Sequence, residues 1–218
     1  MPAFSSPVTP SPVAIKRLPW MRRLSFISPR LSRLLTLFSY GSLSLWAYVE
    51  SHSAITRFCE YPGYVIVDGR RLLATFYVEG AKYRQFLVIQ DDIELVPEHP
   101  QRVPTYAGAE VFTVTPAWLA PHKQWIDNWH QINPYIVCNA RFISTQMLDV
   151  AAHLIAEPMA LFDIEHALQR RLEPQLARTA VFMLLHQGRL ASVDLVTGPL
   201  SGTTQFLPAT MELHRSAP

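Results

Sequence analysis

Hydrophobic and polar positions first follow a regular pattern from residue 42 onwards, and that pattern is helical. Leu43, Trp46 and Ala47 recur at helical spacing, which predicts a buried helix over residues 42 to 52. After a break at Tyr61-Pro62-Gly63, the pattern becomes that of β-strands. The three strands predicted there span residues 64 to 67, 70 to 78 and 83 to 90.

Turn and cap residues support this arrangement. Asp68-Gly69 predicts a hairpin, because a type I′ turn needs positive φ at both central residues. A fourth strand is predicted at residues 111 to 114. Thr115-Pro116 then favours the start of a helix that runs to residue 132, with Pro121 dividing or kinking it. A helix, a three-stranded meander, a strand and a helix predict an α/β sandwich.

The last third of the chain has a different pattern. Helices are predicted from residue 146 to 155, from 163 to 170, and from Pro174 to a stop at Gly188. Two strands, at residues 189 to 196 and 205 to 206, then flank a glycine- and proline-containing segment that is typical of a β-wing. Three helices and a wing predict a winged-helix module.

Composition fits one or two ordinary globular domains. The chain has 218 residues, of which 49% are hydrophobic and 17% charged. Its only cysteines, Cys59 and Cys138, have neither disulfide-framework nor zinc-site spacing, so we expect no metal centre of that kind and a reducing, cytoplasmic location.

Charge is distributed unevenly along the chain. All 17 Asp and Glu residues follow residue 49, whereas the segment before it is basic and rich in proline and serine. Residues 1 to 33 are therefore expected to form a disordered arm that binds a polyanion, either nucleic acid or an anionic membrane surface. The basic residues of this arm are Lys16, Arg17, Arg22, Arg23, Arg30 and Arg33.

Two other interpretations of the N-terminal segment stay open: a solvated tail without function, and a targeting segment. The uncharged run from residue 34 to 49 resembles the apolar part of a targeting segment. It is shorter than the roughly 20 residues of a membrane-spanning helix, and bulky Trp46 and Tyr48 stand where cleavage would occur. We therefore expect no membrane partner.

Short motifs between residues 34 and 213 resemble TnsA, the endonuclease subunit of heteromeric transposases and a member of the PD-(D/E)xK superfamily. Glu60-Tyr61-Pro62 stands in the place of a Glu-Gln-Pro-like tripeptide, and Asp68-Gly69-Arg70 in that of the hairpin. Phe76-Tyr77-Val78 matches the residues after the catalytic aspartate, and residues 112 to 115 resemble the strand before a Thr-led helix. The resemblance implies a restriction-endonuclease-like sandwich over residues 34 to 142 and a winged-helix domain over residues 143 to 213.

The catalytic positions that the resemblance implies carry no formal charge. Such nucleases hold Mg²⁺ with carboxylates from a helix and two strands, and a lysine two residues after the last carboxylate steadies the transition state. In this sequence those four positions are Ser42, Thr75, Val88 and Gln90. The hypothesis is a nuclease fold without catalytic residues, metal or other cofactor. An alternative is an active Mg²⁺-dependent endonuclease that uses Glu50, Glu79, Asp91 or Asp92 as ligands and Lys82 as the cation.

The expected partners are DNA and a TnsB-like transposase subunit or another transposition protein. In the winged-helix module, the third helix would be the recognition helix, but few side chains there suit base readout. Protein docking is therefore favoured over sequence-specific reading, although a winged-helix regulator stays a further alternative. The candidate DNA-binding residues of this module are Arg170, Arg171, Arg178 and Arg189.

Overall fold

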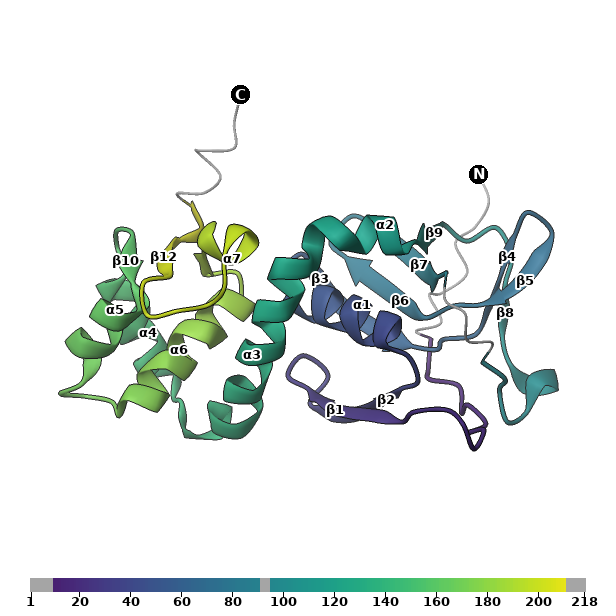
Figure 1. The fold of residues 1–218 in the computed structure, drawn as a ribbon, viewed down its shortest axis with the longest axis horizontal. Coiled ribbons are helices and arrows are strands. Elements are labelled where there is room, and N and C mark those ends of the chain that lie inside the picture. Colours follow the sequence, from purple (N-terminus) through teal and green to yellow (C-terminus); the bar gives the residue numbers. More distant parts are fainter. Residues whose placement is uncertain (1–9, 91–94, 211–218) are drawn as a thin grey trace, which may run out of the picture. The chain divides into compact units, whose positions relative to one another are not determined.

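A computed structural model describes residues 10–90 and 95–210, and the chain folds over these residues as two compact units (Figure 1). The first unit contains residues 10–25, 35–43 and 55–118, and the second contains residues 26–34, 44–54 and 119–210. The boundaries fall inside β1 (Leu24–Ser28), β2 (Arg33–Leu37), α1 (Tyr40–Ser51) and α2 (Pro116–Leu119). This division differs from the expected one at residue 142, because α3 (Lys123–Asn139) packs within the second unit. The mixed α/β class is confirmed.

The main sheet of the first unit has four strands. Their order is β3 (Ile55–Glu60), β6 (Phe76–Gly80), β7 (Arg84–Ile89) and β9 (Val111–Val114). The first three are antiparallel neighbours, and β9 runs parallel to β7. Because alternate side chains share a face, Cys59, Tyr77, Phe86 and Val88 form one apolar cluster. The strand β3 was not predicted from the sequence.

A second, smaller sheet in the same unit has the order β5-β4-β8. These strands are β4 (Tyr64–Val67), β5 (Arg70–Leu73) and β8 (Thr105–Tyr106). The predicted hairpin is present, and Asp68 and Gly69 have φ values of 49° and 74°. The single strand predicted at residues 70 to 78 is wrong, because the chain changes sheets at Ala74-Thr75. There the Ala74 N–H donates to the carbonyl of Gly63 (2.9 Å) and the Thr75 N–H to that of Leu87 (2.8 Å).

The described part of the expected N-terminal arm is folded. Strands β1 and β2 pair, Ile15 forms a bridge with Pro97, and Met21 and Ser28 are buried. The prediction of disorder is therefore wrong for residues 10 to 33, and residues 1 to 9 lie outside the described residues. Composition correctly indicated a basic segment that is rich in proline and serine and contains no acidic residue. It did not indicate the hydrogen bonds that Ser28 makes with residues far along the chain.

The second unit is mainly helical. Besides α3 it contains α4 (Thr145–Leu154), α5 (Leu161–Leu168), α6 (Pro174–His186) and α7 (Asp194–Thr197). Its three short strands are β10 (Met159–Ala160), β11 (Leu190–Ala191) and β12 (Gln205–Pro208), in the antiparallel order β10-β12-β11. Short 3₁₀ turns span Pro100–Arg102, Ala120–His122 and Ala140–Phe142.

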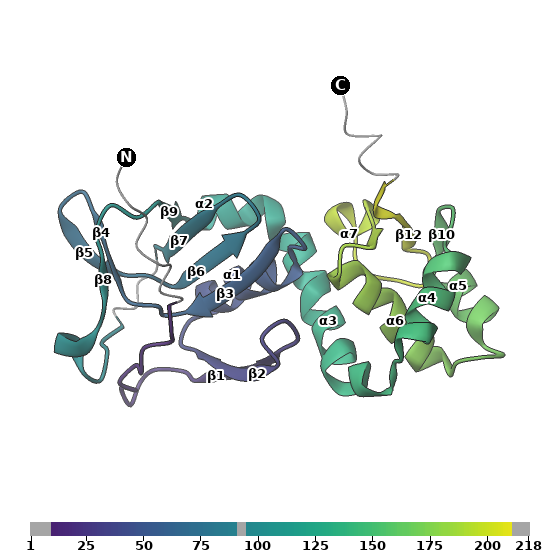
Figure 2. The same cartoon turned by 180° about the vertical axis from the view of Figure 1, so that it is seen from behind.

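Pro121 divides the helical segment after β9 as predicted, since α2, a 3₁₀ turn and α3 follow one another. The strand predicted at residues 189 to 196 is much shorter, because α7 begins at Asp194. Helix α6 lies between α3 on one side and α4 and α5 on the other (Figures 1 and 2). Among the described residues, none of the helices combines the length and the apolar character needed to cross a membrane.

Candidate functional site

The four degenerate catalytic positions lie in the first unit, and their polar groups are used structurally. Ser42 is buried, and its hydroxyl accepts a hydrogen bond from the Ser39 hydroxyl (2.9 Å). The hydroxyl of Thr75 is also buried and accepts from the backbone N–H of Ile89 (3.0 Å). Thr75 therefore lies directly beside β7, the strand that contains Val88 and is followed by Gln90. The Ser42 hydroxyl instead binds Ser39, the residue before α1.

Val88, within β7, and Gln90, directly after it, differ in environment. Val88 packs in the apolar cluster with Tyr77 and Phe86, while Gln90 is exposed and its N–H donates to the carbonyl of Val114 (2.8 Å). A carboxylate at Val88 would have to replace an aliphatic group among aromatic rings, at a large desolvation cost. The surroundings of this position therefore suit the residue that is present.

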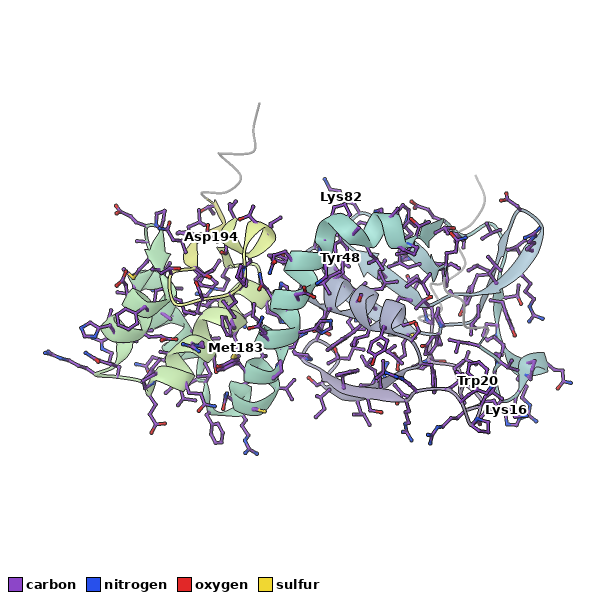
Figure 3. The ribbon with its side chains drawn as sticks, viewed as in Figure 1. Lys16, Trp20, Tyr48, Lys82, Met183 and Asp194 are labelled. Atoms are coloured by element: carbon purple, nitrogen blue, oxygen red, sulfur yellow. The ribbon has the colours of Figure 1, made fainter. Side chains whose placement is uncertain are left out.

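The groups that could replace the missing ligands have other partners or lie outside the described residues. Glu79 forms an ion pair with Arg84 (3.0 Å), and Lys82 projects from the turn between β6 and β7 (Figure 3). Asp91 and Asp92 lie outside the described residues. Across residues 10–90 and 95–210, no group of three His, Cys, Asp or Glu side chains is arranged to hold a metal ion.

The candidate DNA-binding residues of the N-terminal segment divide into two groups. Lys16, Arg17, Arg22 and Arg23 are exposed, and Arg22 also contacts Tyr40 through its guanidinium. Arg30 is half-buried instead, and donates to the backbone carbonyls of Glu50 (2.8 Å) and His52 (3.2 Å) at the end of α1. Arg33 is half-buried too, and donates to the carbonyl of Leu34. The assignment of Arg30 to DNA binding is therefore wrong.

In the second unit, Arg170 and Arg171 are exposed at the end of α5. They line a groove of about 830 Å³ together with Asp149 and His153 of α4. Arg189 forms an exposed ion pair with Asp149 (2.9 Å). Arg170 and Arg171 therefore stay candidates for phosphate contacts, whereas the charge of Arg189 is partly balanced within the protein.

Helix α6, the expected recognition helix, is enclosed by other helices. Arg178 makes a bidentate pair with Glu165 and also donates to the hydroxyl of Tyr135 on α3 (3.1 Å). Thr179 is fully buried beside Asn139, and Phe182 packs edge-on against Tyr135 (5.4 Å between ring centres). The charge of Arg178, a candidate DNA-binding residue, is therefore paired within the protein, although its side chain stays 35% exposed. The pairing with Glu165 raises the pKa of Arg178, which fits a structural charge.

A buried carboxylate, Glu50, is the centre of the largest polar cluster that the sequence did not predict. Its side chain is 0% exposed and accepts hydrogen bonds from the Ser28 hydroxyl, the Arg30 backbone N–H (2.8 Å) and the Trp46 indole (3.3 Å). His186, at the end of α6, binds the same carboxylate (2.9 Å). The cluster thus joins three segments of the second unit that are far apart in sequence.

The cluster around Glu50 contains the residue types of a Ser-His-carboxylate catalytic triad, but it arranges them differently. A serine nucleophile needs a histidine that removes its proton, and it needs access to substrate. Here the Ser28 hydroxyl donates to the carboxylate itself, and both Ser28 and Glu50 are fully buried. The cluster is therefore structural. A signal for it does exist in the sequence: Glu50 follows Trp46 by one helical turn, so a charge lies on an apolar helix face.

The pKa of Glu50 reflects these contacts. Burial by itself raises this pKa, but hydrogen bonds from His186 and Ser28, the charge on His186 and the Arg30 N–H hold it below its ordinary value. Burial lowers the pKa of His52 and of His130. In the folded protein all three groups therefore resist protonation more than they do in the unfolded chain.

Comparison with known proteins adds no relative: the sequence matches no protein-family model and no curated protein.

Glu50→Gln is expected to lower the free energy of unfolding by about 3 kcal/mol, because it leaves His186 and Arg30 facing a neutral amide in a buried site. Urea unfolding followed by circular dichroism measures the change. Glu79→Gln is the matched control, since its exposed ion pair with Arg84 should contribute less than about 1 kcal/mol. Equal effects of the two substitutions would contradict the structural role of Glu50.

Stability is expected to fall in two stages as the pH is lowered. The folded-state pKa values of His52 and His130 lie below 6.5, so the unfolded chain binds more protons and stability is lost from about pH 6.5 downwards. The contribution of Glu50 is present above its ordinary pKa of 4.5 and is lost as the pH falls through its lower folded-state value. Thermal melts from about pH 2 to pH 8 test both stages. His130→Gln should reduce the first stage, whereas His99→Gln, at an exposed position, should not.

Proposed function

We propose that the protein is a catalytically inactive, TnsA-like accessory protein of DNA transposition that binds DNA and a transposase partner. The proposal rests mainly on the position of Thr75. An aspartate and a Glu-x-Lys pair act together only when they lie on neighbouring strands, and the backbone of Thr75 is hydrogen-bonded to that of Leu87 in β7. This position of Thr75 beside β7 supports the proposal, and the side chains at all four positions carry no charge.

Strand order supports the finer fold assignment. After α1, strands β3, β6 and β7 form an antiparallel meander and β9 adds in parallel, as expected of a restriction-endonuclease-like sheet. In the second unit, α4, β10, α5, α6, β11 and β12 follow one another in the order of a winged helix. The sheet order β10-β12-β11 also fits that fold. Both assignments belong to the proposal.

The described basic residues favour non-specific contacts over base reading. Lys16, Arg17, Arg22 and Arg23 are exposed in the first unit, as are Arg170 and Arg171 in the second. By contrast, on α6 Thr179 is buried and the guanidinium of Arg178 is paired with Glu165 and with the hydroxyl of Tyr135. A protein that binds phosphates but reads no bases contributes affinity and position to an assembly, and a partner would supply sequence recognition. This argues against the winged-helix regulator.

Replacing Lys16, Arg17, Arg22 and Arg23 by alanine is expected to weaken binding to duplex DNA of any sequence. Each lost phosphate contact should reduce the slope of log affinity against log salt concentration by about 0.9. Fluorescence anisotropy at several salt concentrations measures this slope. Arg178→Ala is the control: it should lower the unfolding free energy by about 1–2 kcal/mol and leave the slope unchanged. If the fourfold variant keeps the salt dependence of the wild-type protein, the assignment of these four residues to DNA binding is wrong.

Supercoiled plasmid incubated with the full-length protein and Mg²⁺ or Mn²⁺ is expected to stay uncleaved, because the four positions offer no carboxylate to bind the metal. Gel electrophoresis over a range of protein concentrations measures the outcome. Cleavage that Glu79→Ala or Asp91→Ala abolishes would instead support the active endonuclease with rearranged ligands.

A further inference from the structure

The second unit contains a pocket of about 320 Å³ that neither the degenerate nuclease positions nor the candidate DNA-binding residues explain. Its walls come from the end of α1, the start of α3, the segment after α6, and α7. The residues on which the argument depends are Tyr48, His52, His122, Trp125, Ser192 and Val196. Its volume lies at the lower end of the range for small-molecule sites.

One side of the pocket is aromatic. The ring of Tyr48, labelled in Figure 3, lies 4.3 Å from that of His52 and 4.8 Å from that of His122, centre to centre. Trp125 is fixed in place because its indole N–H donates to the hydroxyl of Ser51 (2.7 Å). Planar groups held in this way suit a flat ring, since stacking on an ordered side chain costs little entropy.

The described residues that line the pocket include no Asp, Glu, Lys or Arg. Burial lowers the pKa of His52, which keeps its imidazole uncharged near neutral pH. Ser192 is only 4% exposed, and its hydroxyl has no hydrogen-bond partner within the described part of the chain. A charged ligand would be unpaired here, whereas a neutral ligand with several donors and acceptors would find partners.

We propose that this pocket binds a single nucleobase, unstacked from a DNA strand. The assignment to DNA rests on the proposed function, whereas the preference for a nucleobase follows from the lining. An apolar aromatic side chain of a partner protein would leave the buried hydroxyl of Ser192 without a partner, whereas a base can bind it through its edge while stacking through its face.

Two basic residues beside the pocket fit a nucleotide. Lys123 follows His122, Arg189 follows Gly188, and their side chains are 76% and 38% exposed. Each now pairs with an acidic side chain, Asp127 or Asp149. Exposed ion pairs of this kind are weak, so a phosphate can compete for the cations.

Free nucleosides test the pocket separately from the rest of the proposal. Calorimetric titration of the full-length protein with adenosine, guanosine, cytidine and thymidine is expected to give saturable binding of at least one of them. Val196→Trp, which places an indole at the pocket wall, should weaken that binding at least tenfold. Val193→Trp is the matched control, because Val193 is exposed next to the same short helix but does not line the pocket. His122→Ala provides a second variant, expected to weaken binding about tenfold through lost stacking.

The outcomes separate the two proposals. If a nucleoside binds and Val196→Trp removes this binding, the pocket assignment is supported, even when duplex DNA does not bind. A failure to bind duplex DNA would overturn only the proposed function. If no nucleoside binds to the folded protein, or if N-acetyltryptophanamide binds more tightly and responds to Val196→Trp, the pocket is not a nucleobase site. Thermal melts of each variant establish that the protein is folded.

Discussion

The second unit depends on one buried negative charge. Glu50 is fully removed from solvent, and a carboxylate in that position is unfavourable unless hydrogen-bond donors surround it. Ser28 and Arg30 reach it from the N-terminal segment, Trp46 from its own helix, and His186 from the end of α6. Because the donors come from three separate segments of the sequence, satisfying the charge requires all three segments to be in place at once. This requirement fixes residues 28 to 30 of the basic N-terminal segment against the end of α1.

Local signals in the sequence were sufficient for some elements of the fold. The helical spacing around Trp46 located α1, Asp68-Gly69 located the hairpin, and Pro121 located the break before α3, because each depends on the residues that form it. The change of sheets at Ala74-Thr75 depends instead on hydrogen bonds to Gly63 and Leu87, which the pattern of residues 70 to 78 does not contain. Strand β3 was missed for the same reason, since its exposed and buried positions are decided by its pairing with β6.

For the candidate sites too, some features could be predicted from the sequence and others could not. The resemblance indicated Thr75 and β7 as neighbours, and the hydrogen bond from the Ile89 N–H to the Thr75 hydroxyl places them together. Sequence reasoning treated Arg30 and Arg178 as available for DNA because a positive charge in a sequence has no visible partner. In the fold, Arg30 binds the carbonyls that end α1, and Arg178 binds Glu165 and Tyr135. A basic residue therefore indicates a DNA contact only where the fold leaves its charge exposed, as at Arg170 and Arg171.

Helix α3 restrains both parts of the second unit that a winged helix would use to read DNA. Through Tyr135 and Asn139 it covers the side of α6 that carries Arg178 and Thr179. Through the buried Asn128 it also holds the segment between β11 and β12, donating to the carbonyls of Leu195 and Gly198 and accepting from the N–H of Leu200 (each 2.8 Å). Releasing the segment between β11 and β12 would break three hydrogen bonds to the buried amide of Asn128, at a cost of about 1–3 kcal/mol for each group left without a partner. Base reading by α6 would therefore require α3 to move at a substantial energetic cost, whereas phosphate contacts by exposed arginines require no such movement.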